Sequence, residues 1–210
     1  MSLFQNKYRI ESIRLKGYDY STSGFYFITI CTKNRVNYFG EIYHNKLIKK
    51  PAAKIVKNIW FNLSKHYPNC LLDVFVIMPN HIHGIIFITD QLGDYKQRAG
   101  SADNNIKFIN KTKYVETGLK PVSTKRNNYK KFQADPANKS NNKQYSLSEI
   151  IRAFKTFSAR EINKYQNTQG QQFWQSRFYD HIIRNEKELE KIREYIINNP
   201  VNWENNRNKF

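Results

Sequence analysis

The sequence predicts an α+β fold, a ferredoxin-like split β-α-β sandwich in which an antiparallel sheet carries helices on one face, with one additional C-terminal helix. Three observations predict it. A strand pattern near residue 25 precedes an amphipathic helix, two apolar runs lie around residues 71–88, and a helix, a strand and a last helix follow a long polar stretch. The resulting order, β-α-β-β-α-β-α, is that of a ferredoxin-like domain with one extra helix.

The first strand and the first helix have clear boundaries. Residues 25–31 (FYFITIC) are mostly β-branched or aromatic and follow Ser-Thr-Ser-Gly, which is typical of a strand entered through a turn. Pro51 suits a first helical turn, and apolar residues recur at helical spacing from Ala52 to Leu63. We expect this helix to end at His66-Tyr67-Pro68.

Two apolar runs, residues 71–77 and 81–88, are separated by Met78-Pro79-Asn80. Proline and asparagine suit a turn between antiparallel strands. The second run is apolar on both alternating faces, with Ile82, Ile86 and Ile88 on one and Ile85 and Phe87 on the other. This pattern predicts a central strand that is covered on both sides.

Residues 90–144 differ in amino-acid composition from the rest of the chain. Asn, Lys, Gln, Ser and Gly dominate, and hydrophobic periodicity disappears. We expect a basic, largely unstructured insertion within a single domain that spans residues 1–210. It could be an arm that contacts nucleic acid or a tolerated surface insertion.

Order is expected to resume at Ser146, where Ser-Leu-Ser-Glu forms a capping box ahead of apolar residues at helical spacing. Residues 173–183 have strand character. Asn185 and Glu188 can cap a last helix, which we expect Pro200 to terminate near Asn199.

Charge and composition limit the class of partner. Lys and Arg number 35 against 17 Asp and Glu, a formal net charge of +18, which points to a polyanion such as nucleic acid. An A+T-rich genome, in which lysine accumulates, is the alternative cause. No apolar run reaches the roughly 18–20 residues of a membrane span, and residues 1–14 do not resemble a signal peptide, so we expect a cytoplasmic protein.

Cysteine usage supports neither a zinc ribbon nor a disulfide framework. Only Cys31 and Cys70 are present, far apart and outside any CxxC pair. Both are expected to be reduced and buried.

His81 and His83 form a candidate metal pair at the start of the predicted central strand. Alternation along a strand sends both imidazoles to one face, about 7 Å apart along the chain, while Ile82 anchors the other face. An HxH pair alone is weak evidence, because such spacing arises by chance. Its context strengthens it: a Pro-Asn turn precedes the pair, and Gly84 would let a backbone or a phosphate approach closely.

The last helix carries a candidate nucleophile. Leu189, Ile192 and Ile196 form its packing stripe, and Tyr195 shares a face with Asn199. If that face is turned toward the histidines, Asn199 can add a neutral oxygen ligand while the Tyr195 hydroxyl points at a phosphate on the same ion. The alternative is a packing role, since the chain has 14 tyrosines.

A tyrosine would suit cleavage followed by rejoining of a nucleic-acid strand. The sequence has no P-loop or kinase-like signature for using ATP. The energy of the phosphodiester bond must therefore be kept between cleavage and rejoining, and a covalent phosphotyrosine bond keeps it. Phenol, with a pKa near 10, leaves more readily than an alkoxide. A divalent cation would neutralise developing charge; two imidazoles, one amide oxygen and waters suit Mg²⁺ or Mn²⁺, although imidazole also binds Zn²⁺ or Ni²⁺.

Three segments together resemble the REP-associated tyrosine transposases of the single-tyrosine HUH superfamily, which includes small insertion-sequence transposases. They are residues 76–85 (VIMPNHIHGI), 173–184 (FWQSRFYDHIIR) and 195–200 (YIINNP). The resemblance implies that His81 and His83 are the HUH metal pair, that Tyr195 is the nucleophile and that Asn199 is the third metal-side residue. The polar stretch 90–144 is longer than the family pattern leads us to expect.

The resemblance also implies a reaction and a substrate. Tyr195 would become joined to the 5′ phosphate of the cut strand and release a free 3′ hydroxyl, which can later attack that linkage. The substrate would be a single-stranded hairpin formed by a REP-like palindrome, bound by a monomer or a homodimer.

Basic and aromatic residues near these motifs offer a plausible DNA-binding surface, in which the aromatic rings could stack on bases. The candidates are Lys46, Lys49, Lys50, Arg152, Lys155, Trp174, Arg177, Tyr179 and Arg184. His181 could be a proton carrier, a DNA contact or a structural histidine, and we leave it outside the catalytic set.

Two other functions are compatible with parts of the pattern. A histidine-triad nucleotide hydrolase also uses alternating histidines on a strand, but a third histidine would be expected where Ile85 stands. A transposase-derived protein that binds DNA without cutting it would keep the basic surface, but it would not need His81, His83, Tyr195 and Asn199.

Overall fold

The computed structural model describes residues 15–90 and 143–207. Four strands form one antiparallel sheet in the order β4-β5-β1-β6, with β1 at Gly24–Cys31, β4 at Cys70–Met78, β5 at His81–Ile88 and β6 at Tyr179–Ile183. Every neighbouring pair is antiparallel. The predicted α+β, ferredoxin-like arrangement is confirmed. The expected insertion at 90–144 lies almost wholly outside the described residues.

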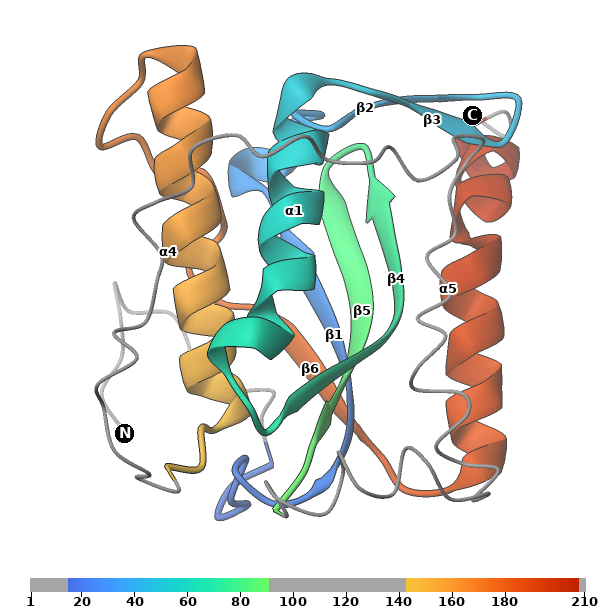
Figure 1. Ribbon diagram of the computed structural model, residues 1–210. Coiled ribbons are helices and arrows are strands. Elements are labelled where there is room, and N and C mark those ends of the chain that lie inside the picture. The colour runs from blue at the N-terminus through green and yellow to red at the C-terminus, as the bar shows by residue number, and fades with distance from the viewer. Residues whose placement is uncertain (1–14, 91–142, 208–210) are drawn as a thin grey trace, which may run out of the picture.

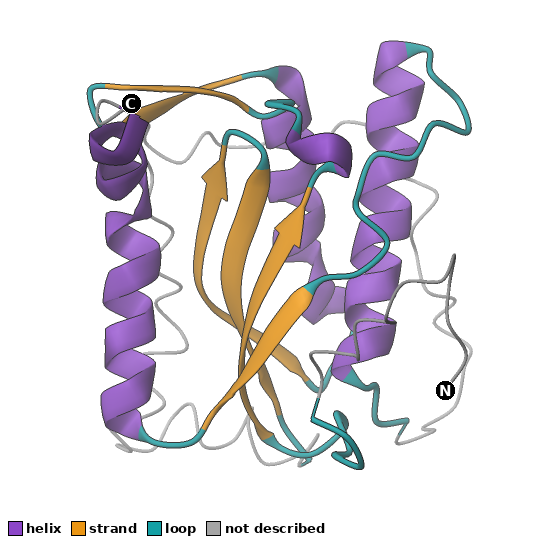
Figure 2. Cartoon of the chain, turned by 180° about the vertical axis from the view of Figure 1, so that it is seen from behind, coloured by secondary structure: helices purple, strands orange, loops and turns teal. Residues whose placement is uncertain are grey.

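Helices cover both faces of this sheet (Figure 1). Helices α1 (Pro51–His66) and α4 (Leu147–Gln166) pack side by side on one face, and α5 (Glu186–Arg207) lies across the other. The view from behind shows the same three layers (Figure 2). The central strand β5 is therefore buried from both sides, as its double-faced apolar pattern predicts.

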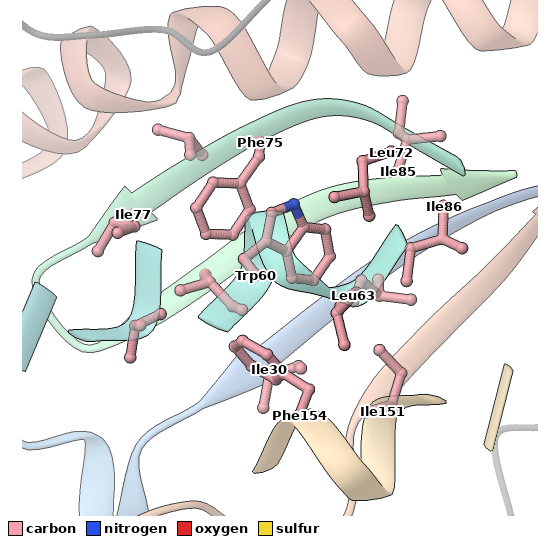
Figure 3. Packing of buried hydrophobic residues seen from close by; sticks show 14 of the residues in the cluster. Ile30, Trp60, Leu63, Leu72, Phe75, Ile77, Ile85, Ile86, Ile151 and Phe154 are labelled. Carbon is pink, nitrogen blue, oxygen red and sulfur yellow. The ribbon is translucent and has the colours of Figure 1, made fainter. Parts of the chain in front are cut away.

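The face toward α1 and α4 holds the main core (Figure 3). The Trp60 indole is fully buried and stacks on Phe75, with ring centroids 4.5 Å apart. A Cβ at Gly84 would lie 2.5 Å from Cζ2 of Trp60, so glycine is required there. The expected role of Gly84 was wrong, because alternation turns it away from the histidines and an indole, not a phosphate, occupies the space above it.

The N-terminal caps predicted for α4 and α5 both form. The Ser146 Oγ accepts from the Glu149 amide at 3.3 Å, and the Glu149 carboxylate accepts from the Ser146 amide at 2.9 Å. At the start of α5 the Glu188 amide donates to Asn185 Oδ1 at 2.9 Å. These bonds satisfy amides that have no partner inside the helix.

A second, two-stranded sheet was not predicted. Strands β2 (Gly40–Tyr43) and β3 (Lys46–Lys49) form a hairpin whose two turn residues, His44 and Asn45, have φ of 48° and 59°. Positive φ at both positions matches the twist of the flanking strands. The strands have only four residues each, so their alternation is too short to stand out in the sequence.

The predicted strand at residues 173–183 is shorter in the structure, where only Tyr179–Ile183 forms β6. Trp174 makes a single bridge to Thr32. The carbonyls of Gln175 and Ser176 accept from Lys155 Nζ at 2.7 and 2.9 Å, which draws this segment toward α4. The apolar residues at 173 and 174 fill the core instead of extending the sheet.

The predicted end of the last helix was also wrong. α5 continues through Pro200 to Arg207, although proline removes one helical hydrogen bond and crowds the preceding turn. The added turn places Trp203 with its ring centroid 5.5 Å from that of His81. Tertiary packing of this ring offsets the local cost of the proline.

Candidate active site

His81 and His83 open β5 and point to the face that α5 covers. Their Nε2 atoms lie 3.0 Å apart, so both rings direct the same nitrogen toward one point. Both side chains are largely buried, at 7% and 5% exposure. The predicted placement of the two imidazoles on one face is confirmed.

Hydrogen bonds hold the other nitrogen of each ring. His81 Nδ1 lies 2.7 Å from Asn80 Oδ1, an acceptor, so this nitrogen carries the proton and the Nε2 atom has the lone pair. His83 Nδ1 lies 2.8 Å from Thr29 Oγ1, which can accept from it in the same way. Partners of this kind orient imidazoles that bind metal ions.

Both imidazoles are neutral at ordinary pH. Burial lowers the pKa of His81 to about 4, and the positive charge of Arg35 lowers it further in the same direction. Burial, and then the neighbouring His81, lower the pKa of His83 to about 3. A neutral imidazole keeps the nitrogen lone pair that a metal ion needs.

Tyr195 lies against the histidine pair. Its ring centroid is 5.4 Å from that of His83 and 6.0 Å from that of Phe27, with interplanar angles of 65° and 86°. The side chain is 48% exposed, so it is reachable from solvent while one side rests on the imidazole. The sequence left open whether this face of the last helix is turned toward the histidines, and in the structure it is.

Asn199 occupies the helix face between two residues that touch the histidines. Tyr195 packs on His83 and Trp203 packs on His81, while Asn199 is four residues from each of them. Residues spaced by four share one face of a helix. The largely buried Asn199 therefore lies on the helix face that is turned toward the imidazole pair.

The donor set fits a divalent metal ion. Two neutral imidazoles converge at Nε2, and an amide lies on the facing helix. Within the described residues, no cluster of three or more His, Cys, Asp or Glu side chains forms a metal site. An ion held here would keep positions open for phosphate oxygens and water.

The expected DNA-binding residues fall in three places. Lys46 and Lys49 lie on β3 and Lys50 caps α1; Arg152 and Lys155 lie on α4, across the sheet from the histidines; Arg177, Tyr179 and Arg184 surround the edge strand β6. Of these, the structure brings Tyr179 to the histidine side: it pairs with Thr29 across the sheet, and its ring lies 6.1 Å from that of Phe27.

Trp174 does not have the position expected of a base-stacking residue. It is only 3% exposed, and its Nε1 donates to Ser158 Oγ at 2.9 Å. Its ring packs against Phe39, Phe154 and Phe173. The expectation is corrected: Trp174 is a core residue, because the segment that carries it pairs with the end of β1 and turns the indole into the core.

His181 has a structural partner. Its Nε2 lies 2.7 Å from Glu188 Oε1, and Glu188 Oε2 accepts from the Arg184 amide at 2.8 Å. Glu188 thus ties β6 to the first turn of α5. Of the three roles left open by the sequence, this contact favours the structural one.

Several residues of the site were missed in the sequence. Thr29 and Asn80 orient the imidazoles, and Phe27 and Trp203 complete the aromatic surroundings. Asn80 adjoins His81 and Trp203 lies four residues beyond Asn199, so spacing could have suggested both. Nothing in the sequence pairs Thr29 with His83, because that contact depends on strand register.

The expected state of the cysteines is correct in part. Both are free; Cys70 is buried and Cys31 only half-buried. Cys31 lies opposite His81 in the register between β1 and β5. No helix in the described parts of the chain is long and apolar enough to cross a membrane.

Comparison with known proteins links this chain to a family. A family model described as "Transposase IS200 like" matches residues 140–199, a range that includes Tyr195 and Asn199. An uncharacterized protein of Haemophilus influenzae is 35% identical over 194 residues, which are 92% of this chain and 89% of that protein. This similarity extends along nearly the whole length of both proteins.

Two solved structures are also similar. A REP-associated tyrosine transposase bound to a REP hairpin aligns with a TM-score of 0.49 at 15% identity, over 92% of this chain and 74% of that one. A Deinococcus radiodurans protein, provisionally described as a transposase, aligns with a TM-score of 0.41 at 16% identity, over 89% and 97%. Neither alignment bears on individual site residues.

Proposed function

From the match of residues 140–199 to the family model of IS200-like transposases, we propose that this chain cuts and rejoins single-stranded DNA through a covalent bond between Tyr195 and a 5′ phosphate. One observation carries the proposal: the half-exposed Tyr195 ring rests on His83, whose Nε2 converges with that of His81. A tyrosine with a packing role alone would be buried in the core, and it would not be exposed to solvent beside two oriented imidazoles.

The reaction conserves the phosphodiester bond. The Tyr195 oxygen attacks phosphorus and the phenol proton is lost; the bond from phosphorus to the 3′ oxygen breaks, and that oxygen takes up a proton. Rejoining reverses these changes, because a 3′ hydroxyl attacks phosphorus and the phenol leaves. No nucleotide hydrolysis is needed at either step.

We propose that His81, His83 and Asn199 hold Mg²⁺ or Mn²⁺. When bound, such an ion neutralises charge on the phosphate oxygens and helps to orient the scissile group. Asn80 and Thr29 would keep the imidazoles turned toward such an ion, and the burial of both rings would exclude part of the competing water. Asn199 is a neutral ligand, so the site keeps positive charge for the phosphate.

The proposed substrate is a single-stranded hairpin formed by a REP-like palindrome. The support is the net charge of +18 and the transposase family model that residues 140–199 match. Lys46, Lys49, Lys50, Arg152, Lys155, Arg177 and Arg184 are proposed phosphate contacts, and Tyr179 is proposed to stack on a base beside the site. Lys155 contributes less than its charge suggests, because it already donates to two carbonyls.

A covalent-adduct assay tests the proposal. Protein is incubated with Mn²⁺ and 3′-end-labelled single-stranded hairpins from the DNA beside its own gene, and a denaturant-resistant protein–DNA band is sought. Tyr195→Phe should abolish the band and leave hairpin binding within about twofold. Tyr165→Phe is the matched control, because Tyr165 is 60% exposed on α4, across the sheet from the histidines.

The same assay separates a DNA-binding protein from an enzyme. Hairpin binding without an adduct under any divalent metal would contradict the proposed cleavage and favour a transposase-derived binding protein. An adduct that persists in Tyr195→Phe would show that another residue is the nucleophile.

A further inference from the structure

A tight turn beside the histidines presents an arginine that none of the roles above uses. The turn η1 (Lys33–Arg35) follows β1, whose last residue, Cys31, lies opposite His81. Arg35 therefore leaves the sheet at the end where the two imidazoles begin β5. Its side chain is exposed.

The backbone of this turn is strained. Asn34 and Arg35 have φ of 54° and 53°, in the left-handed region that residues with a side chain avoid. Asparagine tolerates this region because its short side chain can hydrogen-bond to the nearby backbone, whereas the long arginine side chain gives no such advantage. Strain of this kind is kept where the surrounding structure enforces it, and it is concentrated at functional sites.

Two polar side chains enforce the turn. Thr32 Oγ1 donates to the carbonyl of Val36 or of Asn80, at 2.9 and 3.0 Å. Asn80 Nδ2 donates to the Arg35 carbonyl at 3.1 Å, while the Oδ1 of the same amide accepts from His81 Nδ1 at 2.7 Å. One asparagine thus ties the position of Arg35 to the orientation of His81.

The charge of Arg35 acts on the histidine side of the sheet. Cys31, four residues before Arg35, lies opposite His81 in the register of β1 and β5, and Asn80 links the Arg35 carbonyl to the His81 ring. Within residues 15–90 and 143–207, no carboxylate forms an ion pair with Arg35. The positive charge of Arg35 would be repelled by a divalent ion held at the imidazoles unless an anion binds near both. The arrangement therefore favours binding of a phosphate group.

We propose that Arg35 binds a non-bridging oxygen of the DNA phosphate that lies at the histidine pair. This inference rests on the proposed function, since it adds a substrate contact to that site. A guanidinium donates two parallel hydrogen bonds to phosphate, and it stabilises the charge that develops there during attack by Tyr195.

Rate measurements with three variants test the contact. Arg35→Gln should lower the single-turnover rate of adduct formation about 100-fold, and Arg35→Lys, which keeps the charge without the fork, about tenfold. Lys54→Gln is the matched control, because Lys54 is an exposed cation on α1 that is not among the proposed phosphate contacts. Rates for Arg35→Gln within threefold of wild type would overturn the proposal.

A binding measurement decides the matter even if the protein makes no adduct. A ten-nucleotide single-stranded oligonucleotide is titrated against the Tyr195→Phe protein at several salt concentrations. Removing one phosphate contact should reduce the slope of log K against log salt by about 0.7 in Arg35→Gln, with no change in Lys54→Gln. An unchanged slope in Arg35→Gln, or an equal change in both variants, would contradict the contact.

Discussion

Arg193 on α5 and Asp73 on β4 form a buried ion pair that joins residues 120 positions apart. The Nη2 and Nε of Arg193 donate to Asp73 Oδ2 at 2.6 and 3.0 Å, and both side chains are less than 10% exposed. Arg193 also pairs with Glu190. Since Arg193 is two residues from Tyr195, this pair fixes the helix that carries the proposed nucleophile.

Removing Asp73 should destabilise the protein strongly. In Asp73→Leu the buried guanidinium of Arg193 loses its main partner, which costs about 3–5 kcal/mol in the free energy of unfolding. Urea unfolding followed by circular dichroism measures this loss. The double variant Asp73→Leu/Arg193→Met should recover most of it, because an apolar pair of similar volume avoids burying a charge.

Glu190→Gln is the control for this prediction. Glu190 is half-exposed, and its loss should cost less than about 1 kcal/mol. A loss below about 1 kcal/mol for Asp73→Leu would show that the pair does not hold α5 in place.

Asn80 should control metal affinity without being a ligand. Asn80→Ala frees His81 Nδ1 and allows the other tautomer, in which Nε2 carries the proton and cannot bind a metal ion. We expect Mn²⁺ affinity to fall about 10- to 100-fold, measured by isothermal titration calorimetry. Asn58→Ala, at an exposed position on α1, should leave it unchanged. Equal affinities in both variants would contradict the orienting role.

Metal-free protein should become less stable below neutral pH. Both histidines have a pKa below the ordinary value of 6.5, about 4 for His81 and about 3 for His83. Between pH 6.5 and about 4 the unfolded chain binds protons that the folded chain does not. The free energy of unfolding therefore decreases as the pH is lowered through this window. At pH 5 the loss is about 2 kcal/mol for each histidine.

The comparison that checks this uses His81→Gln/His83→Gln in EDTA. The variant lacks both titrating groups, so its unfolding free energy should fall less between pH 7 and pH 5 than that of the wild type. Parallel curves for the two proteins would mean that the imidazoles gain protons as easily when folded as when unfolded.

Gly84→Ala should destabilise the core beneath the histidines. The added methyl would lie 2.5 Å from Trp60, which is stacked on Phe75 and has little room to move. Overpacking of this kind costs about 1–3 kcal/mol. Thermal unfolding measures it, and Gly24→Ala is the control because a Cβ there meets nothing within 4 Å. Equal melting temperatures for the two variants would contradict the packing argument.

Local patterns in the sequence determined most of the fold. The strand at 25–31, the hairpin around Pro79-Asn80 and the Ser146 capping box follow from periodicity and cap chemistry, which act over a few residues. The same local rules failed for the hairpin Gly40–Lys49, the segment at 173–178 and the end of α5. In the last two cases, contacts with distant residues override the local preference.

By itself, the sequence determined that His81 and His83 share a face of one strand and that Tyr195 and Asn199 share a face of one helix, because side-chain direction follows the period of each element. Only the tertiary structure decided that those two faces meet, that Thr29 and Asn80 orient the rings, and that Trp174 is buried while Tyr195 is open. Strand register and the Asp73–Arg193 pair join residues far apart in the chain, and no local pattern encodes such distances.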